Sequence, residues 1–98
     1  PNELLAREAY VRGLDAFQAG KYSTAAGEFA DAADRGVNAP FHQDAMFMLA
    51  ESYYFDDRCI PARDAYNALA DKYPSTRYLD KLVDELAHGR AMDKVLRA

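Results

Sequence analysis

The side chains in this sequence that are best suited to chemistry are two histidines, a single cysteine and the acidic pair Asp56-Asp57. A calcium loop needs oxygen ligands at alternate positions and a closing Glu, and the acidic pair has neither, so we expect a solvated turn there. His42 and His88 have no His or Cys four residues away, which argues against a zinc site. Cys59 has no recognisable histidine partner for nucleophilic catalysis. We therefore expect no metal, no cofactor and no enzyme activity.

The composition argues against nucleic-acid binding and against a membrane span. The 98 residues carry 12 Lys and Arg against 16 Asp and Glu, which gives a net charge of −4. An acidic chain with no clustered basic stripe is not expected to bind nucleic acid. No run approaches the roughly 18 apolar residues of a membrane span. A chain of this length is expected to form one domain, 1–98, with a thin core.

The sequence repeats itself with a period of 37 residues. At that offset small residues pair with small residues and aromatic residues with aromatic residues: Gly13 with Ala50, Phe17 with Tyr54, Ala25 with Ala62, and Phe29 with Tyr66. The same offset pairs Phe41 with Tyr78 and Leu49 with Leu86, so a third unit begins before the sequence ends. A fixed period of 20 to 50 residues is typical of a solenoid.

Each unit contains two helical patterns separated by a turn, and no strand pattern is found. Gly20 and Gly36 follow the first two patterns, where a helix end favours a positive φ, and Pro40 is expected in the first turn of the third helix. Five antiparallel helices are predicted: Asn2 to about Ala19, Ser23 (as N-cap) to about Arg35, Ala39 to Phe55, a fourth containing Pro61 and ending at Tyr73, and a fifth capped by Ser75. Repeat one would span about 2–37, repeat two 38–74 and the terminal helix 75–98.

The second unit resembles the tetratricopeptide repeat (TPR) family, whose helix-turn-helix unit follows a Trp-x2-Leu-Gly-x2-Tyr, Ala-x3-Phe, Pro pattern. The matching residues are Leu49, Ala50, Tyr53, Ala62, Tyr66 and Pro74, with Met46 in place of Trp. The first unit keeps Gly13, Ala25 and Phe29. The resemblance implies an all-α fold, a right-handed superhelix (solenoid) of two repeats and a terminal helix.

Phe29 lies in an alanine-rich stretch, residues 20–33. Small residues let two helices approach closely, and an aromatic ring can fill the space between them. We expect this alanine-rich helix to lie against its own first helix around Gly13 and against the next unit's first helix around Met46 and Tyr53, with Phe29 filling the gap.

Residues 41–82 are similar to the longer repeats of BamD-like outer-membrane assembly lipoproteins and related periplasmic repeat proteins. In those repeats a Leu-Gly/Ala-x-x-Tyr-Tyr helix precedes a Tyr-Pro-x-Ser/Thr junction, which is Tyr73-Pro74-Ser75-Thr76 here. The resemblance implies a non-catalytic protein-protein interaction scaffold, periplasmic and associated with the outer membrane only through a lipid anchor outside this chain. The family's lipid-modified cysteine and its about five repeats are not seen in this chain, so a cytosolic (cytoplasmic) TPR adaptor that binds an unrelated peptide or partner helix is the alternative.

One face of the first helix of each unit is a candidate binding groove. Residues three or four apart share a helix face, and this face carries Tyr10, Leu14, Phe17, Phe47, Glu51, Tyr54, Asp84 and His88. In TPR proteins it lines the concave groove, so the resemblance implies a protein partner, either a peptide or a helix, anchored there. The alternative is that Phe17 and Tyr54 only stack between successive first helices. Tyr10, Leu14 and Met48 stand where chaperone-binding repeats have Lys or Asn, so a chaperone C-terminus is not expected.

The terminal helix carries more apolar residues than two preceding helices would cover, among them Leu82, Leu86, Met92, Val95 and Leu96. Apolar surface left uncovered at the end of a solenoid promotes association. We therefore expect either a cap or a surface for homodimerisation or docking.

Overall fold

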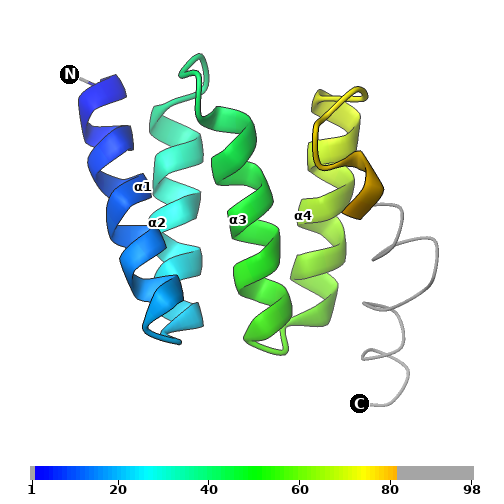
Figure 1. Ribbon diagram of the computed structural model, residues 1–98, viewed down its shortest axis with the longest axis horizontal. Helices are drawn as coiled ribbons and strands as arrows, with labels where there is room; N and C mark the ends of the chain where they lie inside the picture. Colours follow the sequence, from blue (N-terminus) through cyan, green and yellow to red (C-terminus); the bar gives the residue numbers. More distant parts are fainter. Residues whose placement is uncertain (1, 82–98) are drawn as a thin grey trace.

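The computed structural model describes residues 2–81, and this part of the chain is all-α (Figure 1). Its helices are α1 (Asn2–Gln18), α2 (Tyr22–Arg35), α3 (His42–Phe55) and α4 (Cys59–Lys72), with no strand among residues 2–81. Successive helices run antiparallel, and each packs on the next along the chain. A further helical segment begins at Leu79 and is described as far as Lys81. The all-α prediction is confirmed, whereas most of the predicted terminal helix lies outside the described residues.

The turns α1–α2 and α3–α4 are the same structure repeated 37 residues apart. In the first, Gly20 has a φ of 76° and the N–H of Lys21 donates to the carbonyl of Ala16 at 2.8 Å. In the second, Asp57 has a φ of 59° and the N–H of Arg58 donates to the carbonyl of Tyr53 at 2.9 Å. Gly suits this left-handed conformation, and Asp tolerates it better than most residues do. The predicted positive φ at Gly20 and the predicted turn at Asp57 are confirmed.

Two predicted helix starts are wrong. Ser23 does not cap α2, which begins one residue earlier, because the carbonyl of Lys21 already accepts the N–H of Ala25 at 2.9 Å. Pro40 lies outside α3 because consecutive turns come first, with the N–H of Ala39 donating to Gly36 and that of His42 donating to Ala39. Gly36 has a φ of −109°, so it does not provide the positive φ that was expected.

The predicted cap at Ser75 is also wrong, because Thr76 occupies the corresponding role. The Thr76 hydroxyl accepts the N–H of Tyr78 at 3.2 Å, and its carbonyl accepts the N–H of Leu79 at 3.1 Å. Thr76 is only 5% exposed, since its side chain also contacts α3. The tertiary contact therefore selects the capping residue.

Phe29 fills the space between α1 and α2, as predicted. It is fully buried with Ala16 and Ala25. A Cβ atom at Gly13 would lie 2.7 Å from Cε1 of the Phe29 ring, so only glycine allows this approach without movement of the ring. The α3 residues that pack on this cluster are Met48 and Leu49.

The alanine-rich helix α2 packs against α3, as predicted. Its Phe29 ring meets α3 at Met48 and Leu49, whereas Met46 and Tyr53 pack on the second unit's cluster. That cluster is centred on Tyr66, which is fully buried with Ala50 and Ala62. Phe29 and Tyr66 thus occupy equivalent buried positions in the two units.

Ring contacts join one helical hairpin to the next, and they too recur after 37 residues. Tyr10 of α1 stacks on Phe41, with ring centroids 5.5 Å apart. Phe47 of α3 stacks on Tyr78, with centroids 4.0 Å apart and planes inclined by 3°. Each ring pair therefore connects the first helix of one unit to the start of the next unit.

Candidate binding surface

The described residues of the predicted groove fall into an accessible part and a covered part. We call the accessible part the α1/α3 surface; it comprises Tyr10, Leu14, Phe17 and Tyr54. Leu14 is 37% exposed, and the three aromatic residues are half-buried. Asp84 and His88 lie outside the described residues.

The aromatic residues of the α1/α3 surface are held in place by other rings. Phe17 contacts Tyr22 and Phe55 edge-on and at a steep angle, with centroids 5.1 and 5.8 Å away. Tyr54 packs edge-on against Phe55 at 5.4 Å. Such ring pairs contribute about 0.5–1.5 kcal/mol beyond the burial of their area. The surface offers apolar contacts that are already fixed in position.

Phe47 and Glu51 form the covered part, because residues 78–81 lie over them. Phe47 is 7% exposed beneath the Tyr78 ring, and the Lys81 ammonium lies 5.4 Å from its ring centroid. Glu51 is 4% exposed. In the described part of the chain, a partner would meet this region through Tyr78 and Lys81.

Glu51 is a buried carboxylate with two bonding partners. The Tyr66 hydroxyl donates to Oε1 at 2.7 Å, and the Lys81 ammonium donates to Oε2 at 3.0 Å. A buried charge is tolerated when it is paired and hydrogen-bonded. One sequence signal for this arrangement exists: Tyr66 supplies a hydroxyl at the position where the first unit has Phe29, and the residue equivalent to Glu51 is Leu14.

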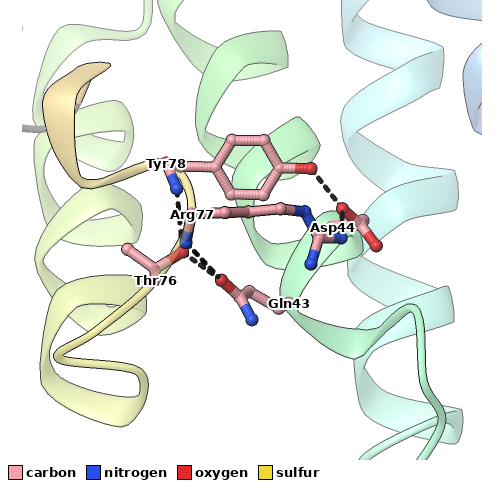
Figure 2. A network of polar contacts seen from close by, with 5 residues as sticks. All are labelled: Gln43, Asp44, Thr76, Arg77 and Tyr78. Carbon is pink, nitrogen blue, oxygen red and sulfur yellow. Dashed lines mark hydrogen bonds and ion pairs between the residues drawn. The ribbon is translucent and has the colours of Figure 1, made fainter.

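A polar network fastens residues 76–78 to the start of α3 (Figure 2). Oε1 of Gln43 accepts the Thr76 hydroxyl and, at 3.3 Å, the backbone N–H of Arg77. Oδ1 of Asp44 accepts from both the Arg77 guanidinium and the Tyr78 hydroxyl. Burial, followed by the hydrogen bond to Asp44, raises the pKa of Tyr78 to about 12. The phenol therefore remains a donor at physiological pH.

Two hollows lie away from the α1/α3 surface, and sequence reasoning did not identify either. A groove of about 320 Å³ runs between α2 and α4, with Met46 and Leu49 of α3 at its base. A second hollow of about 310 Å³ is lined by Gln43 and the segment Lys72–Thr76. Lys72 borders both, so the two hollows adjoin at its side chain. Neither could be seen in the sequence, because each depends on how segments far apart in the sequence are spaced.

The candidate ligands of metals and nucleophiles are dispersed. Within residues 2–81, no group of three or more His, Cys, Asp or Glu side chains could hold a metal ion. Nδ1 of His42 is hydrogen-bonded to the Tyr73 hydroxyl at 2.7 Å, and burial followed by the nearby Lys72 lowers the pKa of His42. Cys59 is half-buried, and its thiol donates to the carbonyl of Asp57 at 3.8 Å.

None of the helices in residues 2–81 is long and apolar enough to cross a membrane.

Comparison with protein families gives a match to part of the chain. A family described as "Uncharacterized protein conserved in bacteria (DUF2200)" matches residues 67–97. The matched segment is less than half of the 98-residue chain, and part of it lies beyond the described residues. Curated proteins and solved structures give no significant match.

Proposed function

We propose that this chain is a non-catalytic protein-protein interaction scaffold built from TPR-type repeats arranged as a right-handed superhelix. The observation that supports this proposal most strongly is the repetition of three-dimensional contacts at the period of the sequence. The stacked pair Tyr10 and Phe41 recurs as Phe47 and Tyr78, 37 residues further on. The left-handed turn residue recurs at the same interval. Contacts of this kind let helical hairpins be added in register.

The scaffold binds a partner through a surface that is formed in advance. Ring contacts hold Phe17 and Tyr54 in position, and Leu14 projects beside them on α1. A receptor that is already ordered loses little conformational entropy on binding, so more of the contact energy becomes affinity. Apolar side chains of a peptide or helix are the ligands that suit such a surface.

The binding proposal is tested by affinity capture with the purified chain in extracts of its native cell. The double variant Leu14→Lys with Tyr54→Ala should lose a partner that the unmodified chain retains, because both changes remove apolar contact area. Ile60→Lys is the matched control, since Ile60 is 53% exposed on a different helix. Circular dichroism must show the same helix content in all three proteins. Equal recovery of every partner by the double variant would refute the α1/α3 surface.

The similarity of residues 41–82 to BamD-like lipoproteins adds a cellular setting, an envelope scaffold at the periplasmic face of an outer membrane. Fractionation of the complete gene product tests this setting directly. Recovery in the outer membrane with release only by detergent supports a lipid-anchored scaffold. Recovery in the cytosol contradicts the envelope setting and favours a cytosolic adaptor with the same fold.

Self-association is the remaining part of the proposal. It rests on the apolar residues Leu82, Leu86 and Val95, which lie outside the described residues. Light scattering over a range of concentrations measures it. A monomer at high concentration contradicts a homodimer, and a dimer that dissociates in the variant Val95→Lys supports it.

A further inference from the structure

The groove between α2 and α4 is mainly apolar, and small side chains line its two sides. Ala33 and Val37 line the α2 side, Ala65 and Ala68 the α4 side, with Met46 and Leu49 between them. Val37 is 48% exposed and Ala68 is also exposed. Alanine walls let another backbone come close, while the methionine and leucine supply deformable apolar contact. A volume of about 320 Å³ is large enough for one or two apolar side chains.

The adjoining hollow, lined by Gln43 and residues 72–76, offers hydrogen-bond donors that have no acceptor among residues 2–81. Gln43 uses its carbonyl oxygen in the network with Thr76 and Arg77, which leaves its NH₂ group as a donor. Ser75 and Lys72, whose side chains carry a hydroxyl and an ammonium donor, line the same hollow. Within residues 2–81 no hydrogen bond or ion pair engages the Gln43 NH₂ group, the Ser75 hydroxyl or the Lys72 ammonium. Three donors around one hollow suit an anion.

The local field where the hollows meet favours a negative charge on the Lys72 side. Asp34 lines the α2 side of the groove and Lys72 the α4 side. At the buried His42 ring, Lys72 lowers the pKa by more than Asp34 raises it. A ligand carboxylate is therefore attracted toward Lys72 on the α4 side and repelled by Asp34 on the α2 side.

We propose that these two hollows form one binding site for an acidic, apolar peptide segment of a partner protein. Apolar side chains occupy the groove between α2 and α4, and a carboxylate next to them pairs with Lys72 and accepts hydrogen bonds from Gln43 and Ser75. The inference rests on the proposed function only in taking the ligand to be a protein segment. It concerns a separate surface, because Met46 and Leu49 lie on the side of α3 opposite Glu51.

Titration of the ¹⁵N-labelled chain with three synthetic peptides, followed by NMR, tests this site. The peptides are acetyl-Leu-Phe-Leu-Glu-amide and its versions with Gln or Lys in the last position. The Glu peptide should shift the signals of Ser75, the Gln43 side-chain amide and Met46, and bind at least about tenfold more tightly than the Gln peptide, as expected for charge-assisted hydrogen bonds. The Lys peptide should bind weakest. Equal binding of the three peptides, or no shift in the groove with any of them, would overturn the proposal.

Variants and simple ligands complete the test. Lys72→Gln should reduce the affinity for the Glu peptide to that for the Gln peptide. Lys21→Gln, in the α1–α2 turn, should leave it unchanged, because that turn and the end of α4 lie at opposite ends of the helices (Figure 1). Asp34→Asn should strengthen binding. Inorganic phosphate that shifts Ser75 as strongly as the peptide does would mean an anion site only, and octanoate that binds as tightly would mean a lipid site; either result overturns the proposal. Loss of this site leaves capture through Leu14 and Tyr54 unaffected, so the two proposals fail separately.

Discussion

Replacement of Gly13 by alanine tests how closely α1 approaches α2. The added Cβ would lie 2.7, 2.8 and 2.9 Å from three carbons of the Phe29 ring. Carbon atoms in favourable contact are about 3.5–4.0 Å apart. The ring is fully buried and packed against Met48 and Leu49 of the next hairpin, so it cannot move away without disturbing that contact.

The expected cost follows from two opposing effects. Overpacking a well-packed core destabilises a protein by about 1–3 kcal/mol, while alanine in a helix interior is about 1 kcal/mol more favourable than glycine. The net change for Gly13→Ala is therefore about 0–2 kcal/mol of destabilisation. Gly27→Ala provides the matched control, because Gly27 is also inside a helix but has no atom within 4 Å of its added Cβ. This control should gain about 1 kcal/mol from helix propensity alone.

Urea unfolding followed by circular dichroism measures both variants. The difference between them isolates the steric effect and should be about 1–3 kcal/mol. Since 1 kcal/mol shifts the Tm of a domain of this size by about 4–8 °C, the two melting temperatures should differ by at least about 4 °C. Equal stabilisation of the chain by Gly13→Ala and Gly27→Ala would refute the close packing of Phe29 on α1.

Three further predictions concern buried side chains. Phe29→Ala should cost about 3–5 kcal/mol in urea unfolding, and an unchanged Tm would contradict the packing described here. Tyr66→Phe removes a donor from buried Glu51 and should cost about 1–3 kcal/mol, whereas a cost near zero would show that the hydroxyl is dispensable. Because the folded-state pKa of His42 is lowered, stability should fall as the pH drops through about 6.5; His42→Gln should reduce that slope, measured as urea midpoints between about pH 7.5 and 5.

Local signals in the sequence predicted those parts of the fold that depend on neighbouring residues. Gly20 marked a left-handed helix end, and the turn at Asp57 was expected from its polar pair. The pairing of Phe29 with Gly13 followed from side-chain size. The choice of Thr76 over Ser75 as the capping residue could not be predicted in this way, because it depends on a contact with Gln43, more than 30 residues away.

The candidate site was harder to predict, for the same reason. Helical spacing correctly grouped Phe47 and Glu51 on one face, but the burial of both comes from Tyr78 and Lys81. The hollows at Lys72 involve α2, α3, α4 and the segment after α4, and no periodicity within one helix indicates them. In this chain the buried clusters around Phe29 and Tyr66 recur at the period of the sequence, so the repeat pattern predicted packing better than surface features.

Two junctions differ in the interactions that hold them: the contact of the first helical hairpin with α3, and the contact of residues 76–81 with α3. Phe29 meets the next hairpin through apolar side chains, whereas residues 76–81 add to the Phe47–Tyr78 ring stack two ion pairs, Asp44 with Arg77 and Glu51 with Lys81. Dissolved salt weakens ion pairs and hardly affects apolar contacts. Rising ionic strength should therefore release amide protons of residues 76–81 to exchange while those of α1 to α3 stay protected. With rising salt, the helices should therefore separate first at residues 76–81 and last at the contact of Phe29 with α3.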